Sequence, residues 1–401
     1  MFATVIAAIT TLLTLSGLGY SLVALWSARS FLRRPRFPAG FAPPVSVLKP
    51  LHGLEPGLAE AFASHCRQTY PGDYEILFGV SSLDDPVVPL VHRLQADFPE
   101  RSIRLIHCAD VLGPNGKTSN VAQLVPHARY DHLVINDADI HVGPHYLARI
   151  MAPFAPIEGH PPTGLVTALY SGRAHGTLGS RLEALGIATD FAPAVLTARY
   201  LDRGLRFGLG STLAVSRPAL QAIGGLAPLA DYLADDYQLG CRIAQAGFGV
   251  ELANEIVQTA VPAWTFSGFW NHQIRWARTM RDSRGSYLGL VFTYGLAWAC
   301  LNLIATGFSV TAFALFSLTL LVRVSLALGI GVGILGDRQV LRDLWLIVPR
   351  DLLSLAIWAW SYAGNTVAWG TERLVLRKGK IVADASADAR PPTAPEEELP
   401  Q

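Results

Sequence analysis

An uncharged apolar run near the start of the chain constrains the fold more than any other feature. Residues 2 to 26 contain no Asp, Glu, Lys or Arg. A cluster of arginines follows directly: Arg29, Arg33, Arg34 and Arg36. A helix needs about 20 apolar residues to cross the hydrocarbon core of a bilayer. The start Met-Phe-Ala lacks the basic n-region of a signal peptide, so we expect a retained transmembrane anchor over residues 1–28. Because arginines favour the cytoplasmic side, the chain after Arg29 is expected to begin in the cytoplasm.

The composition fits a protein that is part soluble and part membrane-embedded. Of 401 residues, 51% are hydrophobic and only 16% are charged, which is too apolar for an ordinary soluble protein. The net charge of +1, without a dense basic patch interleaved with aromatic residues, argues against a nucleic-acid partner. The four cysteines, Cys66, Cys108, Cys241 and Cys300, show no C-x-x-C and no metal-ligand spacing. We therefore expect no disulfide framework and no zinc site, and a domain that faces the reducing cytosol.

Residues 42–285 read as a soluble α/β domain. Short apolar runs separated by Pro, Gly and Asp alternate with helical patterns, for example over 57–68 and 87–98. This alternation predicts a doubly wound, mostly parallel sheet. The expected strands are 45–48, 75–80, 103–107, 132–135 and 164–168. In such sheets ligands bind beyond the carboxyl ends of the strands. The residues that follow the expected strands are therefore the main candidates for a binding site: 49–52, 84–86 and 137–139.

Residues 286–371 are expected to return to the membrane. The runs 287–306 and 308–334 are long and apolar enough to be spans, although Arg323 interrupts the second. A charge inside a span usually snorkels or faces a protein partner. A third run, 352–371, has basic residues on both flanks, so it is either re-entrant or interfacial, or a further crossing lies upstream. Residues 384–401, rich in Pro, Ala and Glu, are expected to be disordered.

Two acidic motifs are candidates for chemistry. Asp137 and Asp139 follow the expected strand 132–135 and lie on the same side of an extended backbone. Such a pair can hold a divalent cation together with phosphate oxygens, although two solvated acids in a turn would give the same pattern. Asp235 and Asp236 precede a helical pattern, where one can cap the helix and the other can act as a general base.

Two further motifs supply cations and aromatic rings. His272, Arg275 and Trp276 lie in a helix-like run before a span, which fits an amphipathic helix at the bilayer surface. That placement leaves Arg275 free to contact a diphosphate, since a guanidinium suits bidentate phosphate recognition. Lys117 lies in a loop that leads into a helix, and it is either a ligand of a donor diphosphate or a solvated loop residue. The loop lacks the complete phosphate-loop pattern.

Together these residues resemble the ceramide glucosyltransferase family of membrane glycosyltransferases, and the chain is most similar to its bacterial branch linked to hopanoid synthesis. The resemblance extends from the anchor, through residues 47–53, to the C-terminal spans. Its motifs are matched here in order: D-P by Asp85-Pro86, N-P-K-x-x-N by Asn115, Lys117 and Asn120, the aspartates of a metal motif by Asp137 and Asp139, G-L-V-T by residues 164–167, and E-D-Y by Asp235-Asp236-Tyr237. There are two departures. Gly116 replaces the usual proline, and His272 takes the first position of (Q/R)-x-x-R-W ahead of Arg275 and Trp276.

The resemblance implies a GT-A fold, a UDP-sugar donor and inversion at the anomeric carbon. It makes Asp236 the base, places Asp85 near the uridine, and gives Asp137 and Asp139 a Mg²⁺ or Mn²⁺ ion on the diphosphate. Lys117, His272, Arg275 and Trp276 would bind the donor. The acceptor would be a membrane lipid, with N-acetylglucosamine transfer to a bacteriohopanetetrol-type hopanoid as the main expectation and glucose transfer to ceramide as the alternative. The location implied is the bacterial inner membrane, with the catalytic domain in the cytoplasm.

Other functions are disfavoured by the pattern of the chain. A processive polysaccharide synthase needs more packed spans than the sequence offers. A transporter is disfavoured because most of the chain between the anchor and Tyr287 is soluble-like. A non-catalytic receptor or scaffold with a nucleotide-binding fold would be expected to lack some of the acids, and all are present, although fold alone does not exclude it.

Overall fold

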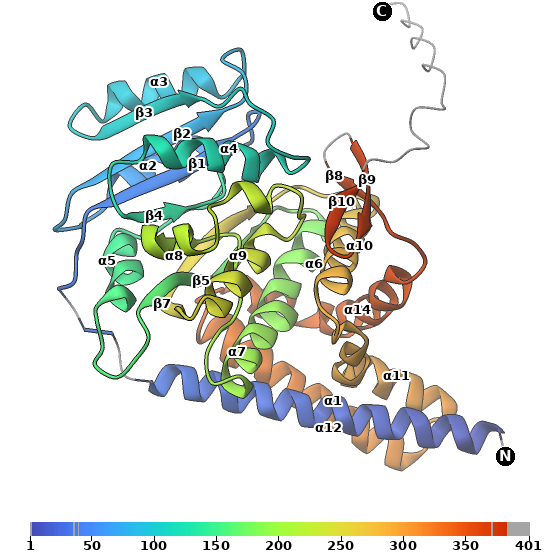
Figure 1. Cartoon of the computed structure of the whole chain (residues 1–401). Helices are drawn as coiled ribbons and strands as arrows, with labels where there is room; N and C mark the ends of the chain where they lie inside the picture. The colour runs from blue at the N-terminus through green and yellow to red at the C-terminus, as the bar shows by residue number, and fades with distance from the viewer. Residues whose placement is uncertain (1, 35–36, 39, 370–371, 383–401) are drawn as a thin grey trace, which may run out of the picture.

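The computed structural model describes residues 2–34, 37–38, 40–369 and 372–382. An α/β domain stands over a layer of long helices, with α1 and α12 side by side at its base (Figure 1). The expected disordered segment 384–401 lies outside the described residues.

The α/β domain is built on a seven-stranded sheet of order β3-β2-β1-β4-β6-β5-β7. Most neighbours pair in parallel, but β6 runs antiparallel to both β4 and β5. The mostly parallel sheet predicted from the sequence is therefore confirmed, with one reversed strand inside it. The strands are β1 Val45–Leu51, β2 Tyr74–Val80, β3 Ser102–His107, β4 His132–Ile135, β5 Thr163–Ala174, β6 Leu213–Ser216 and β7 Gly249–Val261.

Helices cover both faces of this sheet. Those of the α/β domain are α2 Leu58–Cys66, α3 Val88–Asp97, α4 Gly116–Leu124, α5 Tyr146–Met151, α6 Leu178–Gly186, α7 Ala192–Leu201, α8 Arg217–Ala222, α9 Asp235–Gln245 and α10 Phe266–Ser283. A π-helical segment, η3 Ile187–Phe191, joins α6 to α7. Short 3₁₀ segments are η1 Val125–His127, η2 Ala152–Phe154 and η4 Ala227–Leu229.

Alternate strand residues point into two hydrophobic layers, as the period of a strand requires. Leu48 of β1 packs into one layer, whereas Val47 packs into the other. The first layer also contains Phe31 of the N-terminal helix and Leu326 and Ile347 from the C-terminal region. The long helices are therefore packed into the same core as the sheet.

The remaining elements form the helical layer and a small sheet. They are α1 Phe2–Arg33, η5 Tyr287–Thr293, α11 Gly295–Ala305, α12 Val310–Leu326, η6 Ala327–Val332, α13 Gln339–Asp343, η7 Leu344–Leu346, α14 Ile347–Ser361, β8 Thr366–Trp369, β9 Glu372–Arg377 and β10 Lys380–Val382. Two helices in the described residues are long and apolar enough to cross a membrane, Ala3–Arg33 and Val310–Val332. The segments η5 and α11 meet at 60° and would make a third if they form one broken span.

Small and polar residues hold α1 against α11. A Cβ added to Gly17 would lie 2.3 Å from the Cα of Gly295, so the two backbones touch where both helices have glycine. Close approach at glycine pairs is the common way for helices to associate in lipid. The hydroxyl of Thr10 donates to Asn302 Oδ1 at 2.9 Å in the same interface.

The apolar stretch 352–371 is not one element. Its first part belongs to α14, which ends at Ser361, and β8 begins at Thr366 within the small antiparallel sheet β8-β9-β10. Within the described chain, α14 is not one of the helices that are long and apolar enough to cross a bilayer. It begins beside two buried charges, Arg350 and Asp351.

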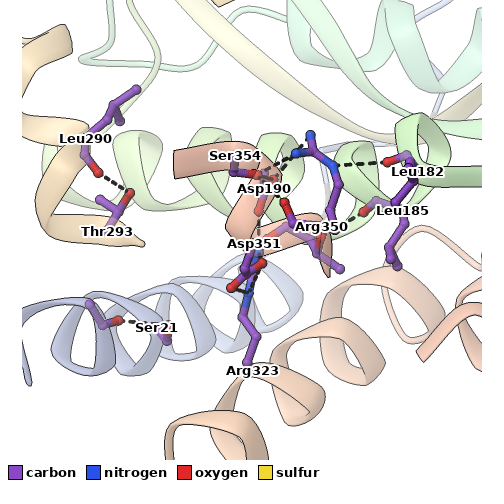
Figure 2. Close-up of polar contacts among 12 residues, drawn as sticks. Ser21, Leu182, Leu185, Asp190, Leu290, Thr293, Arg323, Arg350, Asp351 and Ser354 are labelled. Carbon is purple, nitrogen blue, oxygen red and sulfur yellow. Dashed lines mark hydrogen bonds and ion pairs between the residues drawn. The ribbon is translucent and has the colours of Figure 1, made fainter. Parts of the chain in front are cut away.

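Those charges belong to an ionic cluster that joins α12 and α14 to the α/β domain (Figure 2). Arg323 of α12 donates to Asp351 of α14, with Nε–Oδ2 2.9 Å and Nη2–Oδ1 2.7 Å. The same guanidinium contacts Asp190 and the carbonyl oxygen of Thr189, both on η3. The charge within the expected second span thus faces protein partners.

Arg350 extends this cluster to the helix that carries His272, Arg275 and Trp276. Its Nη2 lies 3.4 Å from Asp190 Oδ2 and donates to Gln273 Oε1 of α10 at 3.0 Å. Its Nε donates to the carbonyl oxygen of Leu182 at 3.1 Å. Gly186 leaves room for the guanidinium, because a Cβ there would lie 2.3 Å from Nη2. Five elements therefore meet around Arg323 and Arg350: α6, η3, α10, α12 and α14.

Candidate active site

The loops after β1 and β2 are tied together by Asp85. Its carboxylate accepts hydrogen bonds from the backbone N–H of Gly53 at 3.0 Å and of Val87 at 2.9 Å. His52 Nδ1 lies 3.6 Å from the same carboxylate. Asp85 is 9% exposed. β1 and β2 are adjacent parallel strands. The hydrogen bond from Gly53 to Asp85 therefore joins two loops at the edge of the sheet where ligands bind in α/β folds.

Lys117 is placed by the start of α4. The side chain of Asn115 caps this helix by accepting from the N–H of Thr118 at 3.1 Å, and its amide donates to the carbonyl oxygen of Tyr232 at 2.8 Å. The loop-to-helix transition expected from the sequence is confirmed. Lys117 Nζ forms an ion pair with Asp137 Oδ1, and its side chain remains 24% exposed.

Lys117 also lies beside Asp236. Burial lowers the pKa of Lys117, but the carboxylates of Asp137, Asp235 and Asp236 outweigh that effect and raise the pKa above its usual value. A Cβ added to Gly210 would lie 3.2 Å from Asp236 Oδ2 and 3.7 Å from Lys117 Nζ, which places both groups against the same backbone. The lysine thus brings two acidic motifs, about a hundred residues apart, into one site.

Asp137 and Asp139 lie just beyond β4 and interact with each other electrostatically. Asp139 Oδ2 accepts from the hydroxyl of Thr259 and from the N–H of Ala260 at 3.2 Å, both on β7. Burial raises the pKa of Asp139, and the negative charge of Asp137 raises it further. Two carboxylates that repel in this way favour a bound cation.

The donor set fits a hard divalent ion that shares its coordination with a ligand. Within the described residues there is no group of three or more His, Cys, Asp or Glu side chains arranged to hold a metal. Asp137 and Asp139 would therefore supply protein oxygens, and phosphate or water oxygens would complete the shell, as is usual for Mg²⁺.

Lys49, the first of the residues 49–52 expected beyond the first strand, is a buried amine beneath the two aspartates. It is fully buried in β1, and its Nζ donates to the carbonyl oxygen of Asp137 at 2.9 Å. Burial lowers the pKa of Lys49 to about 7, against the opposing charges of Asp139 and Asp137. The strand continues past Lys49 to Leu51, so the lysine lies inside β1 and not in the loop that follows it.

Asp236 stands in the first turn of α9, and its pKa is raised to about 6. The causes are burial and the adjacent charge of Asp235, while Lys117 acts in the opposite direction. Asp236 Oδ1 accepts from the N–H of Tyr237 at 2.7 Å. The helix begins after Ala234, so neither aspartate is the N-cap, and the capping role considered for one of them is wrong.

Tyr170 belongs to the aromatic side of the site. Burial raises the pKa of Tyr170, and so do the charges of Asp236 and Glu183, which lie near it. Its ring centroid is 4.9 Å from that of Phe191, which in turn is 6.2 Å from Trp276. Tyr170 lies inside the apolar strand β5, so nothing in the local sequence marks it.

His272, Arg275 and Trp276 lie on α10 at this aromatic side. His272 Nδ1 is 3.0 Å from Glu183 Oε2, and the imidazole stacks on Trp264 with ring centroids 5.2 Å apart. Burial lowers the pKa of Arg275, and Glu183 opposes the shift. Among the described residues the Arg275 guanidinium has no hydrogen bond or ion pair, so it is available to an anionic ligand.

The fold and this acid-lined edge define a class of protein. The structure is similar to that of a mannosyltransferase from Pyrobaculum calidifontis solved in complex with GDP-Man and Mn²⁺, with a TM-score of 0.54 and 20% sequence identity. The similarity covers 88% of this chain and 99% of the other. The protein therefore has the GT-A glycosyltransferase fold.

The family follows from the sequence comparison. Residues 9–382 match the model of glycosyl transferase family 21, and the chain belongs to this family. Ceramide glucosyltransferase 3 of Caenorhabditis elegans is 24% identical over 236 residues, which are 59% of this chain and 50% of that protein. The ceramide glucosyltransferase of Candida albicans is 30% identical over 107 residues, 24% of this chain and 20% of that protein. The matched part is thus half or less of the length of these relatives.

Proposed function

We propose that the protein is an inverting lipid glycosyltransferase that moves a sugar from a UDP-sugar to a hydroxyl group of a membrane lipid. The observation that carries the proposal is the site around Lys117, which pairs with Asp137 and lies beside Asp236. A metal-diphosphate position and a base position are thereby adjacent. The helices that are apolar enough to cross a bilayer pack into the same hydrophobic layer as the sheet. This packing supports a site that lies close to the bilayer that contains the lipid acceptor.

Asp236 is the proposed base. It takes the proton from the acceptor hydroxyl as that oxygen forms a bond to the anomeric carbon, and the bond from this carbon to UDP breaks with its electron pair leaving on the diphosphate. A carboxyl with a pKa of about 6 suits this role, because it is ionised at neutral pH yet is a stronger base than an ordinary aspartate.

The donor is held by the rest of the site. Asp85 fixes the loops that flank the uridine position, and Lys117 and Arg275 bind the diphosphate, with His272 and Trp276 completing the wall. Asp137 and Asp139 would hold Mg²⁺ or Mn²⁺. That ion would neutralise charge on the departing diphosphate as a Lewis acid.

Two pairs of substrates follow from different observations. The matched relatives are ceramide glucosyltransferases, which favours UDP-glucose and ceramide. The motif resemblance favours UDP-N-acetylglucosamine and a bacteriohopanetetrol-type hopanoid. Both acceptors are long apolar molecules with hydroxyl groups, and both fit a catalytic domain on the cytoplasmic face of a bacterial inner membrane.

The test is UDP release by the detergent-purified full chain with each donor against each acceptor, with and without EDTA. Metal-dependent release with one pair supports the proposal and names both substrates. Retention of a growing glycan chain would instead indicate a processive synthase. UDP binding without release from any pair would overturn catalysis in favour of a binding role.

Asp236→Asn tests the base. This variant should bind UDP as the wild type does and lose transfer. The matched control is Asp231→Asn, which alters a half-exposed aspartate of the preceding loop that pairs with Lys380 and should leave transfer unchanged. Turnover retained in Asp236→Asn would sink the assignment.

A further inference from the structure

The small sheet β8-β9-β10 stands beside the candidate site, although it follows α14 in the chain. Figure 1 shows it next to α10 and apart from the seven-stranded sheet. β9 and β10 are joined by the turn Lys378-Gly379, in which the two φ angles are 50° and 77°. Positive φ at both central positions is what a type I′ hairpin turn requires, and such turns suit the twist of paired strands. β10 is therefore held closely on β9, and its other edge is free to pair.

The free edge of β10 pairs with the segment that leads to the candidate base. The N–H of Ile381 donates to the carbonyl oxygen of Asp231 at 2.7 Å. The N–H of Leu233 donates to the carbonyl oxygen of Gly379 at 3.4 Å. Leu233 also packs against the apolar cluster of the small sheet, which consists of Val367, Leu374, Leu376 and Ile381. The side-chain pair of Asp231 with Lys380 is half-exposed and adds little. Backbone hydrogen bonds and apolar contacts thus hold residues 231–233 to β10.

The opposite edge of the same segment is held by Asn115. Its side-chain amide donates to the carbonyl oxygen of Tyr232, and its backbone N–H donates to that of Ala230, both at 2.8 Å. Because successive peptide groups of an extended chain point to opposite sides, residues 230 and 232 face Asn115 while residues 231 and 233 face β10. Asn115 also caps α4, the helix that carries Lys117. The segment that leads to Asp236 is thus held from both sides.

The small sheet is also bound to α10, the helix that carries Arg275. Arg278 of α10 donates to the carbonyl oxygen of Thr366 in β8. Asp282 of α10 accepts from the N–H of Gly379 at 3.3 Å. Both side chains lie within two turns of Arg275, since an α-helix has 3.6 residues per turn. The small sheet therefore reaches from the helix with the diphosphate-binding candidate to the segment that leads to the base.

We propose that β10 is a positioning element of the active site, which holds the segment before Asp236 and so sets the base against the donor diphosphate. The proposal rests on the proposed function and adds a part of the chain that lies beyond the site residues. α10 has a second anchor, because Arg350 donates to its Gln273. Loss of the β10 contact would therefore displace the base more than the helix that carries Arg275.

The test breaks this contact in the full chain. Ile381→Pro removes the N–H that donates to Asp231, because proline has none. We expect kcat to fall at least tenfold while the Kd for UDP and the KM for the donor stay within twofold, since a small misplacement of a reacting group is costly. Ile381→Val keeps both the N–H and an apolar side chain, so it is the matched control and should retain kcat. An unchanged kcat in Ile381→Pro, or a parallel loss of kcat and UDP binding, would overturn the proposal.

A second measurement does not depend on turnover. Amide hydrogen exchange of the detergent-purified full chain is followed by mass spectrometry. Peptides that cover residues 230–236 should exchange at least tenfold faster in Ile381→Pro than in the wild type, while peptides of β1 and β4 keep their rates. Equal exchange of residues 230–236 in both proteins would overturn the proposal.

A variant on the other side of the contact guards against a general loss of folding. Leu233→Asn weakens the packing against the small sheet and leaves β10 itself unchanged. It should give the same fall in kcat and the same local gain in exchange, and it decides the matter if Ile381→Pro loosens β1 and β4 as well. Exchange that depends on Ile381 in a wild-type protein that transfers sugar to no lipid would support the contact and overturn the proposed function.

Discussion

The substitution Arg323→Gln tests whether the ionic cluster holds α12 and α14 to the α/β domain. Arg323 is 8% exposed, and its guanidinium makes three contacts with Asp351 of 3.1 Å or less as well as those to Asp190 and Thr189. Glutamine is shorter and uncharged, so Asp351 would be left as a buried carboxylate without its close partner. Removal of one partner from a buried ion pair costs about 3–5 kcal/mol.

That cost is large enough to measure in the full chain. It corresponds to a fall of roughly 100- to 4000-fold in the ratio of folded to unfolded protein, since 1.4 kcal/mol is a factor of ten. For domains of ordinary size, about 2–4 °C of Tm is lost per kcal/mol, which gives a fall of about 6–20 °C. The assay is thermal unfolding of the detergent-purified protein, followed by tryptophan fluorescence.

Two comparisons separate the buried cluster from a general effect of losing an arginine. Arg342→Gln removes a guanidinium that is 58% exposed and pairs with Asp343, and it should cost no more than about 1 kcal/mol. The double variant Arg323→Gln with Asp351→Asn removes both charges and should recover part of the loss, because the two sites are coupled. A Tm for Arg323→Gln equal to that of Arg342→Gln, or a double variant whose loss equals the sum of its parts, would refute the argument.

Three further predictions concern the site. The rate of transfer at low acceptor concentration should rise through pH about 6 as Asp236 loses its proton and should fall about tenfold per unit below that value; a flat profile from pH 5 to 8 would contradict a base with this pKa. Asp139→Asn should raise the Mn²⁺ concentration for half-maximal UDP release at least tenfold, and an unchanged metal dependence would remove Asp139 from the metal site. Arg350→Lys replaces the branched guanidinium that donates to Gln273 of α10 with a single amino group that cannot make the same set of contacts. We expect α10 and its Arg275 to be displaced, so the KM for the donor should rise several-fold while kcat changes less. Equal losses in both constants would count against such positioning.

The sheet could be predicted from the sequence where strands are short, apolar and followed by polar residues. All five expected strands are present, and the two helices expected over 57–68 and 87–98 correspond to α2 and α3. The strands β6 and β7 were not predicted. β6 has only four residues, and β7 alternates buried and partly exposed positions with polar side chains, so neither stands out as an apolar run.

The acidic residues of the candidate site could be predicted from the sequence, but the contacts between distant segments could not. Asp137 and Asp139 follow a recognisable strand and Asp236 stands at the start of a recognisable helix, so each is visible in the local pattern. Tyr170 lies within an apolar strand, and the contact of Arg323 with Asp190 spans 133 positions of sequence. No local periodicity encodes such a contact, because it arises only when separate helices pack together.

The same packing links α12 and α14 to the candidate site. Arg350 binds Asp190 of η3, Leu182 of α6 and Gln273 of α10, and α10 carries the Arg275 available for a diphosphate. Residues on α12 and α14 also complete the hydrophobic layer beneath the sheet. A shift of these helices relative to the sheet would therefore move α10 and its Arg275 relative to Asp137 and Asp139, which follow β4 and contact β7. Since α6, η3 and α7 follow one another without a break, the same charges anchor the middle of one long helical segment that runs beside the sheet.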